Sequence, residues 1–520
     1  MANAKEPSSD TSISSRHETE IDRGTDLEHA PASPKDDKAA DVPPDGGYGW
    51  VCVACAFWIN GSTWGINSTY AIFLAYYLSH DYFPNTSALV YAFVGGLSIS
   101  MAVFVAPLAT ACIRRFGTKV TLHTGIFFET ISLIGASFAT QKYQLILAQG
   151  MCFGIGMGFL FVGSVGIIPQ WFSKKRSVAN AISAAGSGCG ALIWSLSTQS
   201  MIDRLGLPWA FRILAVLSFS INLVASNVIR DRNSQVGSRH RSFDLEILRR
   251  PEFLLLQAWS WFSMLGYVIV LFSLPAYATT IGLTAQQGSV VAAMLNLGQM
   301  CGRPFIGLAS DRYGRLNLAM LFTLLCGVFC FVFWIPTEVA PSRLGLLIFF
   351  AIVGGALAGT FWATVAPVCA EVVGLKDLPS ALSWTWLVMV PPVTCAEPIA
   401  LELRRVNTNR WVYVYAQLFC GLSYIAGGLC LWVVRGWKVG EMEEQERLQR
   451  KAAGHAAGHA AVEKNKEAVL PDSGVSPDPR DHMPGVKDDA LTRQQSAASV
   501  REAGWRPRDL LRRMLKVTIV

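Results

Sequence analysis

The chain is built from long apolar segments, and this pattern limits its fold more than any other feature. Each segment is near the roughly 20 residues with which a helix crosses a 30 Å hydrocarbon core. Backbone N–H and C=O groups inside lipid must bond within their own segment, so helices are predicted rather than strands. We place twelve segments at 51–78, 87–112, 119–139, 143–168, 177–201, 208–229, 253–280, 287–309, 316–336, 343–369, 378–403 and 411–434. The sequence therefore predicts an all-α protein that crosses a membrane twelve times.

The composition agrees with a membrane protein. Of the 520 residues, 52% are hydrophobic and 16% are charged, whereas soluble proteins have about 25% charged residues. The formal net charge is +7, but the basic residues lie in short loops between segments, so no nucleic-acid partner is predicted. Most of the twelve cysteines fall inside apolar segments without the spacing of a disulfide or a metal site. We therefore predict neither a metal nor a cofactor.

Polar tails flank the apolar region, and both are predicted to be disordered because they cannot bury enough apolar area to offset the cost of ordering. The start of the chain has no basic region followed by an apolar run, so the first segment is expected to act as its own signal and stay in the membrane. For residues 504–520, a basic amphipathic helix on the membrane surface and a disordered end are both open interpretations. The regions are a tail at 1–45, a first half at 46–230, a central loop at 231–252, a second half at 253–435 and a tail at 436–520.

The distribution of basic residues predicts the orientation. The loops after the second, fourth, sixth, eighth and tenth segments hold more Lys and Arg than the other loops. The positive-inside rule places these loops and both termini in the cytoplasm, and we predict a multi-pass protein of the plasma membrane. Asn85, in Asn85-Thr86-Ser87, then lies outside and is a glycosylation candidate.

The sequence repeats itself at long range. Arg115-Phe116-Gly117 follows the second segment, and Arg312-Tyr313-Gly314 follows the eighth, 197 residues later. The fourth and tenth segments are both rich in glycine and both end near a proline. Two six-helix halves related by a parallel repeat are predicted, an arrangement found among secondary transporters.

Three motifs carry a family resemblance. Asp45-Gly46-Gly47-Tyr48-Gly49-Trp50 resembles the first-helix signature of the monocarboxylate transporter family, a branch of the major facilitator superfamily. Trp171-Phe172-Ser173-Lys174-Lys175-Arg176 resembles that family's signature at the start of the fifth helix. The stretch from Gly307 to Arg315 resembles the loop motif of the whole superfamily. The resemblance covers about residues 43–436, and the polar tails look like the fungal branch.

The resemblance implies a twelve-helix major facilitator fold that works by alternating access. In the superfamily, the loop motif is a cytoplasmic latch whose charged residues pair with helix ends of the other half and favour the outward-open state. Asp311, Arg312 and Arg315 match that pattern and are predicted to gate the protein. In the first half, Arg114 stands where an acid would help, so the copy in the second half is expected to be the working latch.

Arg303 is the strongest candidate for binding substrate. Ionisable residues within a span are rare and usually functional, and a guanidinium offers a planar fork that matches a carboxylate. In the family, an arginine at the matching place binds the substrate carboxylate. The structural alternative is that Arg303 snorkels or pairs with a carbonyl. Proton-coupled animal members have an aspartate where Gln299 stands and a lysine where Ser68 stands. Simple lactate–proton symport is therefore disfavoured relative to a larger or neutral substrate or coupling through another group.

Further polar residues complete the predicted site. Asn296, Gln299, Ser68, Asn67 and Tyr70 are predicted to line the cavity with Arg303. Two buried carboxyl groups are proton-coupling candidates, and for both the alternative is a structural hydrogen bond between helices: Glu129 and Glu397. Four tryptophans are expected to be interface anchors rather than cavity walls: Trp259, Trp261, Trp384 and Trp386.

Together these observations predict a secondary active transporter for a small organic anion or related metabolite. The predicted partners are a small-molecule substrate, a coupled proton and membrane lipid; the sequence does not identify an ancillary subunit. An exporter of a fungal secondary metabolite and a non-transporting nutrient sensor on the same fold are the alternatives. An enzyme is disfavoured because no nucleophile–base pair, metal-spaced cluster or nucleotide-binding loop is present in the sequence.

Overall fold

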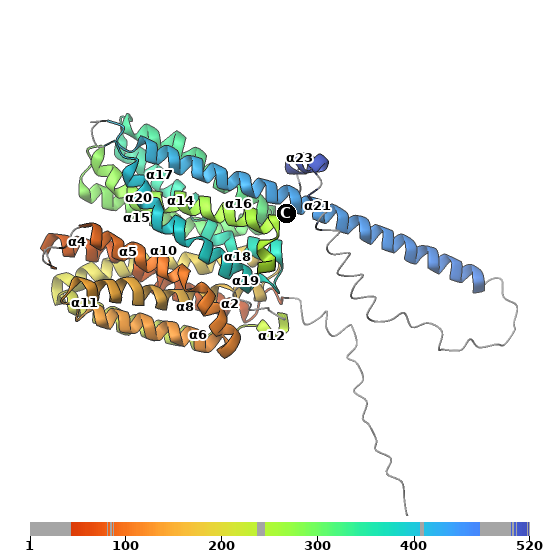
Figure 1. Ribbon diagram of the computed structural model, residues 1–520, viewed down its shortest axis with the longest axis horizontal. Coiled ribbons are helices and arrows are strands. Elements are labelled where there is room, and N and C mark those ends of the chain that lie inside the picture. Colours follow the sequence, from red (N-terminus) through yellow and green to blue (C-terminus); the bar gives the residue numbers. More distant parts are fainter. Residues whose placement is uncertain are drawn as a thin grey trace, which may run out of the picture. The chain divides into compact units, whose positions relative to one another are not determined.

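The computed structural model describes residues 43–80, 82–83, 86, 88–236, 245–405, 410–467, 501, 504–505, 507–516 and 518. All regular elements within these residues are helices. Figure 1 shows that the helices from α2 to α11 lie together and that the helices from α14 to α21 form a second group beside them. We call these groups the first half and the second half. The glycosylation candidate Asn85 lies outside the described residues.

The first half contains helices over most of its length. Its elements are α2 (Gly49–Ser62), α3 (Trp64–Ser68), α4 (Tyr70–His80), α5 (Ala88–Phe104), α6 (Ala106–Ala136), α7 (Lys142–Leu145), the π-helix η1 (Ile146–Cys152), α8 (Phe153–Val165), α9 (Ile168–Trp171), α10 (Arg176–Leu205) and α11 (Leu207–Val228). Two short helices follow it, α12 (Asn233–Val236) and α13 (Leu245–Leu248).

The second half also contains helices over most of its length. Its elements are α14 (Pro251–Thr280), α15 (Ala285–Tyr313), α16 (Arg315–Phe329), the π-helix η2 (Cys330–Trp334), the 3-10 helix η3 (Ile335–Glu338), α17 (Arg343–Ala358), α18 (Thr360–Val373), α19 (Leu378–Val388), α20 (Val390–Glu402) and α21 (Val414–Glu467). Helix α23 (Pro507–Leu515) lies near the end of the chain.

Helices occupy all twelve predicted segments, so the all-α fold class is confirmed. Of the described helices, six are long and apolar enough to cross a membrane, and a pair bent by 41° within 93–136 makes a seventh. The others are interrupted or more polar. The first segment breaks at Thr63 and Thr69, and the eleventh breaks at Met389. At Thr63 the hydroxyl donates to the carbonyl of Ile59, 2.6 Å away, a back-bond that often bends helices.

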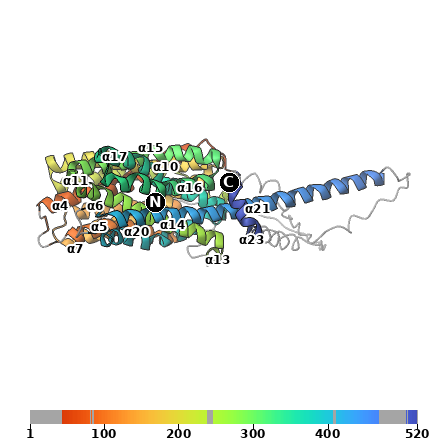
Figure 2. The same cartoon turned by 90° about the horizontal axis from the view of Figure 1, so that it is seen from above.

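The predicted end of the last span differs from the observed one. Helix α21 continues to Glu467, so residues 436–467 are helical and not part of a disordered tail. Figure 2 shows this helix running out beyond the others. The extension is rich in Ala, Glu, Lys and Arg, which favour helices. Charged pairs one turn apart also support it: Lys438–Glu441 at 2.7 Å, Arg447–Glu444 at 3.6 Å and Arg450–Glu446 at 3.8 Å.

Small residues allow α10 to pack closely on α2. A Cβ at Gly190 would overlap the carbonyl oxygen of Gly61, and a Cβ at Gly186 would overlap that of Phe57. Trp194 donates its indole N–H to the Gly61 carbonyl at 2.8 Å. Without glycine at these places the two helices could not approach each other at this distance.

We expect Gly190→Ala to destabilise the folded protein by about 1–3 kcal/mol, because overpacking forces a rigid backbone to move. Thermal unfolding of the purified protein, followed by size-exclusion fluorescence, measures this effect. Gly166→Ala is the matched control, since nothing lies within 4 Å of a Cβ built there. Equal melting midpoints for the two variants would show that α2 and α10 are not packed as described.

Candidate functional site

A cavity lies between the two halves. Its wall takes residues from α2, α3, α5, α8 and α10 of the first half and from α14, α15, α18 and α20 of the second. Its polar wall includes Asn60, Asn67, Ser68, Asn296, Gln299 and Arg303. A molecule bound there would contact both halves at once.

Arg303 projects from α15 into this boundary and is 4% exposed. Its Nη1 donates to the carbonyl of Ala184 and to the hydroxyl of Ser187, both on α10 and both at 2.6 Å. Its Nη2 donates to Gln299 Oε1, one turn earlier, at 2.7 Å. The hydroxyl of Tyr267 donates to the same oxygen at 3.0 Å. Neutral oxygens therefore orient the guanidinium across the interface between the halves.

The charge of Arg303 has no carboxylate partner among the described residues. Its Nε also has no hydrogen-bond partner there. In the described part of the cavity wall, Arg303 is the only charged side chain. A buried cation without a countercharge is costly, so Arg303 is a candidate to bind an anionic group.

Aromatic side chains form an apolar part of the site. The ring of Trp362 lies 5.2 Å from that of Trp64 and 6.0 Å from that of Tyr267. Trp64 also packs edge-on against Phe161 at 5.4 Å. All four residues line the cavity. This aromatic wall suits a flat or apolar body attached to the anionic group.

Two of the tryptophans expected at the membrane interface lie elsewhere. Trp259 and Trp386 are fully buried, which contradicts their assignment as anchors. Trp386 packs against Phe161 at 4.9 Å and stacks with Trp362 at 6.1 Å. Trp386 therefore supports two rings of the aromatic wall, Phe161 of the first half and Trp362 of the second.

The structure separates the remaining predicted site residues. Tyr70 is outside the described cavity wall; its hydroxyl donates to the Tyr91 carbonyl at 2.7 Å. Its predicted place in the cavity wall is therefore wrong, because its hydroxyl binds a carbonyl of α5 instead. Asn67, by contrast, lines the cavity and accepts a hydrogen bond from Ser98 at 2.7 Å.

Neither acidic candidate lines the cavity. Glu129 is 1% exposed within the first half, and its Oε2 accepts from Asn222 at 2.7 Å. Glu397 is partly buried on α20, and both of its oxygens lie 3.0 Å from the hydroxyl of Ser273. Glu397 lies one turn after Val393, which does line the cavity.

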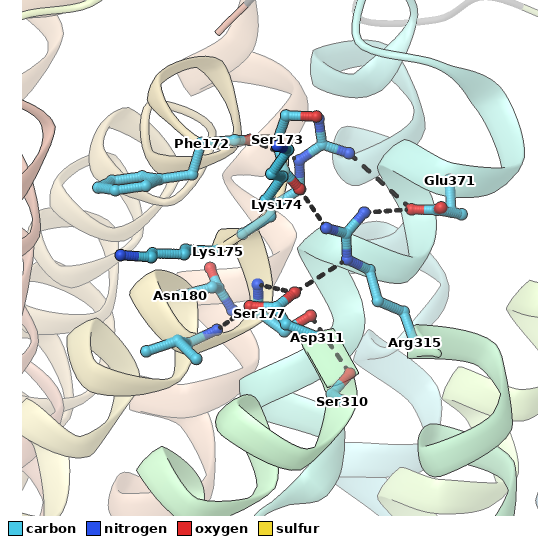
Figure 3. Close-up of polar contacts among 12 residues, drawn as sticks. Phe172, Ser173, Lys174, Lys175, Ser177, Asn180, Ser310, Asp311, Arg315 and Glu371 are labelled. Atoms are coloured by element: carbon cyan, nitrogen blue, oxygen red, sulfur yellow. Dashed lines mark hydrogen bonds and ion pairs between the residues drawn. The ribbon is translucent and has the colours of Figure 1, made fainter. Parts of the chain in front are cut away.

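At one end of the molecule, Asp311 at the end of α15 binds the start of α10. Its Oδ1 accepts from the backbone N–H of Ser177 at 3.0 Å, and its Oδ2 accepts from that of Val178 at 2.9 Å. These N–H groups belong to the first turn of α10, which has no intrahelical acceptors and carries partial positive charge. The carboxylate therefore caps a helix of the opposite half, as Figure 3 shows.

Arg315 extends this contact into a network (Figure 3). Its Nε donates to Asp311 at 3.2 Å, its Nη1 donates to Glu371 at 2.5 Å, and its Nη2 donates to the carbonyl of Ser173. Glu371 also lies 3.9 Å from Arg176. We call Ser173, Ser177, Val178, Asp311, Arg315 and Glu371 the latch. It ties α10 to α15 and α18.

Arg312 does not belong to the latch. It is exposed, and its guanidinium lies over the ring of the neighbouring Tyr313 at 5.6 Å. Its predicted gating role is therefore wrong, because residues 311 and 315 share one side of the chain at the turn after α15 while 312 faces outward.

The first-helix signature contacts the fifth-helix signature directly. Asp45 Oδ1 accepts from the backbone N–H groups of Ser173 at 2.6 Å, Lys174 at 2.7 Å and Lys175 at 3.4 Å. Trp50 packs edge-on against Phe172 at 5.0 Å. The Ser173 residue is thus held by Asp45 through its N–H and by Arg315 through its carbonyl. Two separate motifs fix one turn of chain that faces the other half.

Sequence reasoning missed several of these residues. Glu371 provides an acid to the latch, and Asn180 of α10 donates to the Ala363 carbonyl of α18 at 2.7 Å. An acid close to the polar end of the tenth segment was a usable signal for Glu371. Tyr267 and Trp362 gave no signal, because aromatic residues are common in every span.

Comparison with known proteins gives consistent results. Residues 52–389 match the family model described as Major Facilitator Superfamily. The probable transporter MCH2 of Saccharomyces cerevisiae is 36% identical over 405 residues, which is 77% of this chain and 85% of that protein. The Fujikurins efflux protein of Gibberella fujikuroi is 27% identical over 416 residues, 77% of this chain and 88% of the other.

The fold is also similar to that of a solved transporter. The proton:xylose symporter XylE, bound to 6-bromo-6-deoxy-D-glucose, superposes with a TM-score of 0.57. The two sequences are 14% identical, and the match covers 74% of this chain and 94% of the symporter. At this identity the likeness concerns the fold alone.

Proposed function

This chain belongs to the Major Facilitator Superfamily, and we propose that it is a transporter of a small organic anion, close to the monocarboxylate branch of that superfamily. The observation that carries the proposal is Arg303, a buried cation that lines the cavity between the halves and has no carboxylate partner among the described residues. An arriving anion supplies the missing countercharge. Intramembrane ionisable residues of this kind commonly mark substrate pathways.

The aromatic wall narrows the class of substrate. Trp64, Phe161, Trp362 and Tyr267 offer ring faces and edges on which an apolar body can pack. Asn67, Ser68 and Asn296 add neutral polar groups for further hydrogen bonds. The site suits a carboxylate that carries a flat or apolar body. Gln299 holds Arg303 without neutralising it, so the substrate and not the protein balances the charge.

Alternating access follows from the latch. The latch joins the halves at one end, so release of Asp311 from α10 would let that end separate. The basic loops at this end support a cytoplasmic location by the positive-inside rule, and we propose that both termini share that side and that the protein lies in the plasma membrane. The substrate would then enter from outside while the latch is closed.

Of the two proton-coupling candidates, we propose Glu397 rather than Glu129. Glu397 lies one turn from Val393 in the cavity wall, and its only described protein donor is a neutral hydroxyl, Ser273. Glu129 is enclosed within the first half beside Asn222. Glu397 is therefore our first candidate for the group that takes up the coupled proton.

We expect purified protein in liposomes to take up labelled aromatic carboxylic acids faster than lactate, and to do so faster with an inward proton gradient. Glu397→Gln is expected to remove the gradient effect, whereas Glu129→Gln should keep it. Uptake and efflux of acids and neutral metabolites, with and without the gradient, measure both effects. If no acid is transported and a neutral metabolite is exported, the proposal is contradicted.

Export of a larger metabolite is the second candidate. One relative is named as an efflux protein, and the aromatic wall offers apolar surface to a metabolite larger than a simple acid. An exporter would have the same fold and the same latch. It would differ in the direction of transport and in the solute. Efflux from preloaded liposomes separates it from uptake.

A further inference from the structure

The described residues from 501 to 518 form a compact attachment at the end of the second half that carries the latch. In Figure 1, α23 lies against α21 where that helix leaves the other helices. A Cβ at Gly436 would approach Met514 and Leu510, and a Cβ at Gly440 would approach Arg513 and Gly504. Two glycines one turn apart on α21 therefore make the groove in which α23 sits.

Hydrogen bonds hold the end of α23 in this groove. Arg435 of α21 donates to the carbonyls of Met514 at 2.9 Å and of Lys516. The indole N–H of Trp432 donates to the Met514 carbonyl at 2.8 Å. These carbonyls belong to the last turn of a helix, where cationic donors are favourable. The attachment is a specific cap and not a loose contact.

Other residues connect the segment to the starts of two spans. The indole N–H of Trp505 donates to Glu252 of α14 at 3.2 Å. Asn317 near the start of α16 donates to the carbonyl of Thr518 at 2.7 Å. Arg435 is the first charged residue after the apolar run of α21. These contacts place α23 at the level where three spans leave the hydrocarbon core.

The outer face of α23 combines apolar and basic side chains. Leu511 and Leu515 lie one turn apart and are 71% and 73% exposed. Arg512 is exposed beside them, and Lys516 is exposed but paired with Glu443 of α21 at 2.6 Å. The segment 507–516 carries four basic residues and one acid, Asp509. Exposed leucines flanked by cations are the pattern of a helix that lies in a membrane interface.

We infer that α23 binds the anionic lipid surface of the membrane through Leu511, Arg512 and Leu515. The leucines would enter the boundary between headgroups and acyl chains, and Arg512 would contact phosphate and carboxylate groups of the lipids. Lipid is the occupant because the groove fixes this face at the membrane level and because its charge is complementary to an anionic leaflet.

The experiment uses full-length protein in nanodiscs of phosphatidylcholine alone or of phosphatidylcholine with phosphatidylserine. Leu511→Cys is labelled with a membrane-impermeant maleimide, and labelling of the unmodified chain is subtracted. We expect labelling of the introduced thiol to be roughly tenfold slower in the anionic discs, since each nearby cation adds about a kcal/mol of attraction. Addition of Arg512→Ala should reduce this difference.

Two controls make the result decisive. Arg450→Cys lies on α21, where the native side chain is 84% exposed, and its thiol should label equally in both kinds of disc. Gly440→Leu should displace α23 from the groove and raise the labelling of Leu511→Cys. Equal rates at position 511 in both lipids would overturn the inference. Slow labelling in detergent as well would also overturn it, because a protein contact would then cover the leucines.

Discussion

Arg303→Ala is expected to reduce transport of an anionic solute by roughly a hundredfold, because loss of one partner of a buried, hydrogen-bonded charge pair costs 2–5 kcal/mol. The guanidinium is the only charged group in the described cavity wall, so no other described side chain there can replace it. Initial uptake rates in liposomes, normalised to the amount of inserted protein, measure the effect.

Two variants separate recognition from folding. Arg303→Lys keeps the charge and loses the planar fork, so it should retain part of the transport. Arg312→Ala removes an exposed arginine from the same helix and should transport normally. Anion transport at the normal rate by Arg303→Ala would make Arg303 a structural donor to Ala184 and Ser187. Loss of anion transport together with retained efflux of a neutral metabolite would favour the exporter.

The sequence predicted the helical class of all twelve segments because length and apolar content are properties of single segments. It did not predict where helices break. The interruptions at Thr63, Thr69 and Met389 depend on how a segment packs against its neighbours, and hydropathy does not contain that information. The sequence also did not predict that α21 continues to Glu467. This part of the helix is stabilised by local charge pairs, and it is too polar for hydropathy to indicate a span.

The sequence predicted some residues of the candidate site and not others. Arg303, Gln299 and Asn296 share one side of α15 at helical spacing, and the structure places all three in the cavity wall. Tyr70 follows a break in the first segment, so spacing along the sequence no longer fixes its direction. Glu371 joins the latch through residues far from it in sequence, Arg315 of its own half and Arg176 of the other half. Sequence distance cannot reveal such contacts without a homologous structure.

The latch and the first-helix signature act on one segment of chain. Asp45 accepts from N–H groups at 173–175, and Asp311 accepts from those at 177 and 178. Asp45 precedes α2 of the same half, whereas Asp311 comes from the opposite half. The Asp45 contact fixes the backbone just before α10. The Asp311 contact joins that part of the first half to the second half when the latch end is closed. Only the second must break when the halves separate.

We expect Asp311→Asn to shift the protein toward the state in which the latch end is open. The amide loses the negative charge that interacts with Arg315 and with the start of α10, and each charge-assisted hydrogen bond contributes about 1.5–3 kcal/mol. A shift of a few kcal/mol is enough to reverse a two-state population. Net transport should fall because the protein returns less often to the outward-facing state.

Accessibility of a cysteine behind the latch measures this shift. Ser187→Cys lines the cavity on α10, and its labelling from the latch side should increase when Asp311→Asn is added. Asp203→Asn, near the other end of α10 and exposed, is the matched control and should leave labelling unchanged. If Asp311→Asn also leaves it unchanged, the other contacts between the halves close this end by themselves. The cap on α10 would then be a consequence of closure and not its cause.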